Sequence, residues 1–332
     1  MTTPTGLHRL YQRLGHVGIS PHFARRALPS WWDDSIASVP SGLQQAALLF
    51  SRAFNIDVSS LEEDCVRFRA VEHKFKLNKD VSPKDVSASA HFATAIARLA
   101  LTALPMPPAP MPTDASIIRA DILSTFESVG LGGLLDFCRR FSVPVIHIKS
   151  FPGKKMTGLA IRVADRYAVI LGHSKHPAYM LFNLAHELGH IVSGHLERDG
   201  FVADESIGRT ETGDTDEKQA NAFASVLLNG KALQYKSANG RYLNASTLKE
   251  AATRKSGEIK VDAGHIILNY AHSAGGSGAS YATANAALKL LPIESKGETI
   301  IDRSLASSLD WSLLSEDQIE LIQAATEIKR PA

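Results

Sequence analysis

Apolar residues recur at helical spacing through the N-terminal part of the chain. The clearest pattern lies within residues 87–104, where four apolar side chains would share one face of a helix: Phe92, Ile96, Leu99 and Ala103. Residues 6–57 also have a helical pattern. We therefore expect a helical N-terminal domain over residues 1–100.

Proline interrupts this pattern over residues 101–116, where the sequence LTALPMPPAPMPTDAS contains five prolines. Proline lacks a backbone N–H and fixes its own φ, so a segment of this kind favours an extended chain. The pattern predicts a linker between two domains.

Strand-like runs follow the linker, after a further predicted helix over residues 117–141 that is broken at 130–133. Three short runs are rich in Val and Ile: residues 143–148, 159–163 and 167–171. Ala164, Asp165 and Arg166 separate the last two runs and indicate a hairpin turn. We expect a small antiparallel sheet.

Two longer helices complete the predicted central domain. The first begins at Pro177, a residue suited to the first helical turn, and is expected to run to about residue 196. The second covers residues 215–229, and the rest of the chain has a mostly helical pattern. The fold class is therefore α+β, with a central domain over residues 117–230 and a helical C-terminal region over 231–332.

The helix that begins at Pro177 contains the sequence AHELGH, in which His186, Glu187 and His190 form an HExxH motif. A helix turns by about 100° per residue, so histidines four positions apart share a face and can bind one metal ion. Glu187 can act as general base toward water that the ion makes more acidic. The motif predicts one zinc ion per chain and a hydrolytic site with Glu187 as the catalytic residue.

The apolar residues of this helix fall on the face opposite His186: Leu181, Leu184, Leu188 and Ile191. One face would pack into the core while the other lines a cleft. If the helix continues to His195, that imidazole lies about 180° from His186. We therefore exclude His195 as a metal ligand.

A hydrolytic zinc site usually has a third protein ligand, and the best candidate is Glu217, at the start of EKQANAFASVLL. Ala220 and Ala224 are small enough to let this helix approach the HExxH helix closely. Alternatively, Glu217 caps its own helix, with Asp214 as N-cap. Spacing alone leaves four rival acidic ligands in the same loop: Glu205, Glu211, Asp214 and Asp216.

The segment FNLAHELGHIVSGH, followed after a polar loop by EKQANAFASVLL, resembles the ImmA/IrrE family of bacterial metallopeptidases, which pair an HExxH helix with a later ExxAN helix. The resemblance covers residues 117–230. It implies a zincin-like catalytic domain with His186, His190 and Glu217 as zinc ligands and Glu187 as general base. One departure is that the family's ANxFAxxLL run often continues into proline, whereas this chain continues with Asn229 and Gly230.

The family also implies a regulatory endopeptidase that cleaves or inactivates a helix-turn-helix repressor and so switches on stress or mobile-element genes. On this basis we expect zinc-dependent hydrolysis of a peptide bond in a protein substrate, a transcriptional repressor. The alternative is a DNA-binding regulator or antitoxin-like module with a non-catalytic zinc site. Glu187 favours catalysis, because a purely structural zinc site needs only its ligands.

Two strings in the N-terminal domain, GISPHFARRALPSWW and SGLQQAALLFSRAFNIDVSSL, resemble a degenerate helix-turn-helix of the repressor type. This resemblance implies DNA as a partner. Trp31 and Trp32 favour a small core or a protein-binding surface instead, because DNA-reading helices place polar side chains at base edges.

Composition and charge mainly exclude other classes of protein. The 36 Lys and Arg residues nearly balance 34 Asp and Glu, so no strong overall field attracts nucleic acid or an anionic membrane. Cys65 and Cys138 share no CxxC spacing, which excludes a disulfide framework and a cysteine zinc knuckle. The sequence lacks a signal-like start and a long apolar stretch, so we expect a cytoplasmic protein with no membrane partner.

Overall fold

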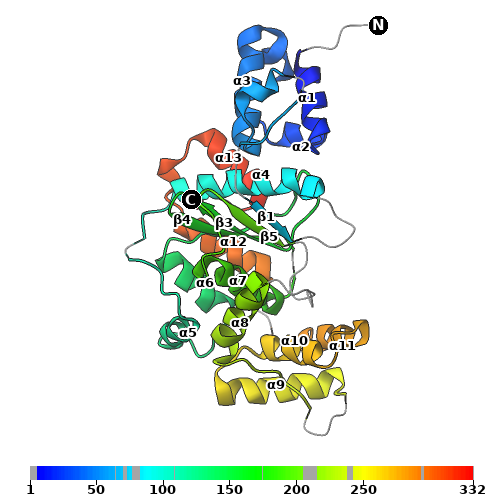
Figure 1. Cartoon of the computed structure of the whole chain (residues 1–332), viewed down its shortest axis with the longest axis vertical. Coiled ribbons are helices and arrows are strands. Elements are labelled where there is room, and N and C mark those ends of the chain that lie inside the picture. The colour runs from blue at the N-terminus through cyan, green and yellow to red at the C-terminus, as the bar shows by residue number, and fades with distance from the viewer. Residues whose placement is uncertain are drawn as a thin grey trace.

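The structure is a computed structural model, and it describes all residues except 1–5, 64, 70–72, 77–82, 108, 174, 205–214, 238–241, 293–294 and 332. A five-stranded sheet lies near the middle of the molecule, with helices on both of its faces (Figure 1). The predicted α+β fold class is confirmed. Among the described residues, no helix is both long enough and apolar enough to cross a membrane.

The sheet has the strand order β1-β5-β3-β4-β2. Its strands are β1 (His73–Lys76), β2 (Val145–His147), β3 (Gly158–Val163), β4 (Arg166–Leu171) and β5 (Phe201–Asp204). β3 is antiparallel to β4 and β5, but β1 is parallel to β5 and β2 is parallel to β4. The sheet is mixed, so the prediction of an antiparallel sheet is wrong. The two outer strands reach their partners through long connections rather than hairpins, and such connections allow parallel pairing.

Alternate residues of the sheet enter two different hydrophobic cores. Leu159 and Ile161 of β3 belong to the core shared with α4 (Pro83–Thr102), which covers one face. Ala160, between them, belongs to the core shared with α7 (Pro177–Val192), which covers the other face. This period of two is expected for a strand that is buried on both sides.

The N-terminal helices are α1 (Gly6–His16), α2 (Pro21–Arg26) and α3 (Pro40–Phe54). Their apolar side chains join the same core as α4 and the sheet. Phe23 of α2, for example, packs edge-on against Phe92 of α4 with ring centroids 5.2 Å apart. The predicted domain boundary at residue 100 therefore falls inside α4. This helix packs against both the N-terminal helices and the sheet.

The proline-rich segment is held at its start by Arg166 of β4. The Arg166 guanidinium donates hydrogen bonds to the carbonyl oxygens of Leu101, Leu104 and Pro105 at 2.5, 3.2 and 2.9 Å. The beginning of the predicted linker is thus part of the packed structure.

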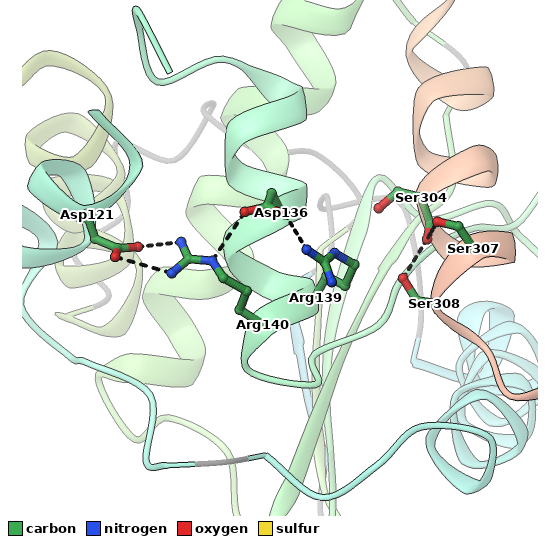
Figure 2. A network of polar contacts seen from close by, with 7 residues as sticks. All are labelled: Asp121, Asp136, Arg139, Arg140, Ser304, Ser307 and Ser308. Atoms are coloured by element: carbon green, nitrogen blue, oxygen red, sulfur yellow. Dashed lines mark hydrogen bonds and ion pairs between the residues drawn. The ribbon is translucent and has the colours of Figure 1, made fainter. Parts of the chain in front are cut away.

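Two helices, α5 (Ala115–Leu123) and α6 (Leu131–Arg140), occupy the region of the predicted helix over residues 117–141. The break between them lies at residues 124–130, so the predicted break at 130–133 is wrong. Figure 2 shows the polar network between them, in which Arg140 of α6 binds both carboxylate oxygens of Asp121 on α5 at 3.2 and 2.5 Å. Arg140 also binds Asp136, one turn earlier, at 3.2 Å. Exposed ion pairs of this kind contribute about 0–1 kcal/mol, so the buried core is the main source of cohesion here.

The C-terminal region has two parts. α9 (Ala245–Ile259), α10 (Ala263–Ser273) and α11 (Gly278–Leu288) surround a small core of their own. α12 (Gly297–Ser308) and α13 (Glu316–Thr326) return to the sheet and complete the cores on its two faces. The last part of the chain therefore supports the same sheet as the first.

Candidate metal centre

α7 carries the HExxH motif in a buried position. The helix begins at Pro177, and Nδ1 of His176 accepts a hydrogen bond from the N–H of Ala178 at 3.2 Å. The predicted apolar stripe packs into the core beneath the sheet and consists of Leu181, Leu184, Leu188 and Ile191. The motif residues His186, Glu187 and His190 are fully buried as well.

α8 (Thr215–Asn229) crosses α7 where both helices have very small side chains. A Cβ atom at Gly189 would lie 2.8 Å from the Cα and from the carbonyl oxygen of Ala220. The missing Cβ of Gly189 therefore permits the two backbones to touch. Glu217 lies one turn before Ala220 and is brought to the two histidines, where it is buried.

His186, His190 and Glu217 form one cluster of metal-ligating atoms. The two Nε2 atoms lie 3.1 Å apart. Glu217 Oε1 lies 3.1 Å from Nε2 of His190, and Oε2 lies 3.5 Å from Nε2 of His186. In the part of the chain that the structure describes, this is the one group of three or more His, Cys, Asp or Glu side chains placed to hold a metal ion.

Hydrogen bonds at the other ring nitrogens orient both imidazoles. His186 Nδ1 lies 3.1 Å from Oδ1 of Asn221, and His190 Nδ1 lies 2.9 Å from Nδ1 of His195. His195 Nε2 lies 2.8 Å from Oε1 of Gln219. Because an amide oxygen only accepts, His195 donates from Nε2 and its Nδ1 accepts the proton of His190 Nδ1.

These tautomers leave an unprotonated Nε2 on both His186 and His190, facing the carboxylate of Glu217. Three acceptors that face one another repel unless a cation lies between them. Histidines that donate their second N–H to a fixed acceptor are also typical of metal ligands. The chemistry of the cluster therefore fits a metal ion.

The position of His195 differs from the prediction. The helix was expected to run to about residue 196, but α7 ends at Val192, and Gly194 turns the chain with a φ of +72°. His195 consequently lies beside His190, with ring centroids 5.1 Å apart. It is outside the ligand cluster, as the sequence reasoning held, but its role in orienting His190 was missed. Gly194 is the signal that could have revealed this, since glycine commonly follows the last turn of a helix.

Glu187 lies directly against β3. A Cβ atom at Gly158, the first residue of β3, would lie 1.9 Å from Oε1 of Glu187 and 2.8 Å from its Cδ. Only glycine leaves room for this carboxylate in its present position. A buried carboxylate beside two histidines that are placed to bind a metal ion can transfer protons to and from a substrate at such a centre.

Of the four acidic residues that rival Glu217 as third ligand, the structure describes only one. Glu205, Glu211 and Asp214 lie outside the described residues, and so does the alternative in which Asp214 and Glu217 cap α8. Asp216 is described, and its Oδ1 lies 3.8 Å from Nε2 of His195. It therefore neighbours the orienting histidine, and Glu217 is the carboxylate in the cluster.

Residues 139–254 match the protein-family model Peptidase_M78, described as the IrrE N-terminal-like domain. The match covers about a third of the chain. The M78 domain contains both α7 and α8, so the resemblance to ImmA/IrrE metallopeptidases is confirmed. No curated protein and no solved structure matches the chain.

The M78 domain extends from the end of α6 to the middle of α9. It includes four strands of the sheet, while β1 and α4 come from the preceding part of the chain. The chain therefore carries a metallopeptidase-like domain whose sheet and core are completed by residues outside it.

Proposed function

We propose that this chain is a zinc-dependent endopeptidase that hydrolyses a peptide bond in a regulatory protein of the cytoplasm. The observation that carries the proposal is the convergence of His186, His190 and Glu217, next to the buried Glu187, inside an M78 domain. A peptidase needs a general base beside the metal ligands, and Glu187 is placed to serve as one.

The distances within the cluster support zinc. Tetrahedral zinc at about 2.0–2.2 Å from its ligands holds the ligand atoms roughly 3.3 Å apart. The three corresponding separations here are 3.1, 3.1 and 3.5 Å. Two imidazoles and one carboxylate are a common ligand set of hydrolytic zinc sites, whereas Ca²⁺ and Mg²⁺ prefer oxygen ligands throughout.

When bound, zinc polarises the scissile carbonyl group and makes water more acidic. Glu187 takes a proton from the attacking water and later passes it to the leaving amine. Gly158 has no side chain, and its absence leaves room for the Glu187 carboxylate against β3. His195 and Asn221 hold the ligand histidines in the tautomer that the reaction requires.

For the substrate we propose a helix-turn-helix transcriptional repressor, whose removal would induce stress or mobile-element genes. The support is the family resemblance, because ImmA/IrrE members typically cleave or inactivate such repressors. DNA is proposed as a further partner of the N-terminal helices, on the resemblance of that segment to a degenerate helix-turn-helix.

The test combines metal content with cleavage of a repressor encoded beside the gene for this chain. We expect one zinc per chain in the wild type, a loss of zinc in Glu217→Gln, and normal zinc in Glu187→Gln. Cleavage of the repressor should fall by about 10²–10⁴-fold in Glu187→Gln, the usual contribution of a general base.

Glu250→Gln, on the exposed surface of α9, is the matched control and should behave like the wild type. Zinc that binds normally without any cleavage would contradict the peptidase and support the DNA-binding regulator. Absence of zinc from the wild type would contradict both accounts of the site.

A further inference from the structure

A cavity of about 380 Å³ lies where α3, α4 and α13 meet, and we infer that it binds a small organic anion. Its lining residues come mainly from α3, α4 and α13, and Figure 1 shows these helices on the α4 side of the sheet. The candidate metal centre is carried by α7 and α8, on the opposite side of the sheet. The cavity, called the arginine cavity below, is therefore separate from the proposed peptidase site.

Three arginines line the arginine cavity: Arg52 of α3, Arg69 in the segment that precedes β1, and Arg98 of α4. The carboxylate among the described lining residues is that of Asp317, whose Oδ1 accepts a hydrogen bond from Nε1 of Trp31 at 2.7 Å. The described walls thus carry more positive than negative charge, which favours an anion inside.

The arginines retain donor capacity for a ligand. Arg69 reaches a carbonyl oxygen and a hydroxyl group at the long distances of 3.3 and 3.4 Å. Arg98 Nη2 lies 3.6 Å from a carboxylate oxygen of Asp199, and Arg98 Nε is buried without a hydrogen-bond partner among the described residues. The exposed pair of Arg67 and Glu63, at 2.5 and 2.8 Å, shows how much closer a satisfied guanidinium binds.

Apolar side chains form much of the rest of the wall, and the largest are Leu49, Leu99 and Leu321. Four uncharged polar residues also line the cavity: Ser51, Asn55, Ser315 and Gln318. Apolar walls with a few convergent polar groups are typical of small-molecule sites, whose volumes are usually about 300–1,000 Å³. Inorganic phosphate would leave these leucines in contact with water. The arrangement therefore fits a compact molecule with an apolar body and one anionic group.

The anionic group is a carboxylate or a phosphate, since arginine binds both through paired N–H donors. Arg52 is the best position for a test, because its side chain is exposed and its replacement leaves the core of α3 intact. Arg9 of α1 is a matched control, an exposed arginine in the same group of helices that lies outside the cavity lining.

The experiment is calorimetric titration of the full chain with four probes: phenyl phosphate, benzoate, inorganic phosphate and phenol. We expect one molecule of phenyl phosphate or benzoate to bind per chain, and inorganic phosphate and phenol to bind at least about tenfold more weakly. The tighter of the first two probes identifies the anionic group. Arg52→Gln should weaken that binding at least about tenfold, and Arg9→Gln should leave it unchanged.

Titration after treatment with a chelator separates this site from the metal centre, because anions also bind zinc. Affinity that is unchanged by the chelator supports the arginine cavity. The proposal is overturned if neither organic anion binds at millimolar concentration, if Arg52→Gln binds like the wild type, or if binding disappears with the metal. Thermal unfolding of each variant without ligand shows whether a loss of binding reflects a loss of folding.

Discussion

Gly158 is the first residue of β3, and the Glu187 carboxylate occupies the space that a side chain would fill there. Gly158→Ala places a methyl group 1.9 Å from the present position of Glu187 Oε1, so the carboxylate must move. We expect cleavage of the repressor to slow by at least about tenfold, because a general base acts only within hydrogen-bond reach. Zinc content should not change, since the three atoms nearest to the added methyl group all belong to Glu187, which is not one of the proposed ligands.

Gly257→Ala is the control for this variant, because a Cβ at Gly257 meets no atom within 4 Å. Gly257 lies inside α9, so this change should keep full activity and stabilise the protein by roughly 0.5–1 kcal/mol. Full activity in Gly158→Ala would show that Glu187 need not hold its present position.

A substitution at His195 tests whether this residue orients His190 for metal binding. His195→Ala removes the acceptor of the His190 Nδ1 proton, so His190 loses the contact that fixes its tautomer. Partners of this kind typically contribute 10- to 100-fold to metal affinity, and we expect a loss in that range. Competition with a zinc chelator measures it. The control is His22→Ala, which changes an exposed histidine of α2 and should bind zinc like the wild type. An unchanged zinc affinity in His195→Ala would show that His195 does not orient His190 for metal binding.

The contrast between these residues shows what spacing alone can predict. His186, Glu187 and His190 could be chosen from the sequence because a regular helix converts spacing into direction. Glu217 was the best candidate for a third ligand because small residues follow it, but spacing alone left four acidic rivals, and the family resemblance favours Glu217. Gly158 could not be chosen, because its position depends on strand register. His195 was missed because its position depends on the residue at which α7 ends, which Gly194 indicates.

Arg119 of α5 links the C-terminal ends of two later helices. Its Nη1 donates to the carbonyl oxygens of Leu227 and Leu228 at 3.1 and 2.7 Å, at the end of α8. Its Nη2 donates to those of Ile259 and Lys260 at 3.3 and 2.9 Å, at the end of α9. A cation between two helix C-termini is favourable, because both ends carry partial negative charge.

Arg119→Met should therefore destabilise the protein strongly. Methionine keeps much of the apolar bulk but leaves four buried or half-buried carbonyl groups without their charged donor, and we expect a loss of about 3–5 kcal/mol. Thermal unfolding measures the change. Arg139→Met, which removes an exposed ion pair with Asp136 at 2.7 Å, should change stability by less than about 1 kcal/mol. Equal effects of the two variants would contradict the role of Arg119.

The range of an individual helix could be predicted more readily than the pairing of distant strands. The predicted range 215–229 is that of α8, which ends where Gly230 adopts a φ of +79°. A local pattern could identify this helix because its end depends on a glycine. The parallel pairing of β1 with β5 could not be predicted, because its partners are more than a hundred residues apart and share no local pattern.

At the scale of the whole molecule, the sheet joins segments from nearly the entire chain. α4 and α13 share one core with β3, and α12 joins the core on the other face. A linear division into domains separates these helices, because it follows composition rather than long-range packing. The arrangement brings Glu298 and Asp302 of α12 close to Glu327, which follows α13, so that their charges interact.

Asp302 of α12 is the clearest case of such an effect. Burial, and to a smaller extent the negative charges of Glu298 and Glu327, together raise its pKa to about 7. Its Oδ1 is buried without a hydrogen-bond partner among the described residues. The folded protein therefore holds a proton on Asp302 at a pH where the unfolded chain, with a pKa near 3.8, has lost it.

A raised carboxyl pKa makes the folded state less stable as the pH rises from about 4 to about 7, because the unfolded chain releases its proton first. Asp302→Asn imitates the protonated side chain and removes this loss. We expect the Tm of the variant to exceed that of the wild type at pH 8, and the difference to shrink toward pH 4. Asp165→Asn, at an exposed hairpin position, should show no such trend. A Tm difference that is the same at both pH values would mean that the substitution acts through packing, and that Asp302 ionises normally in the folded protein.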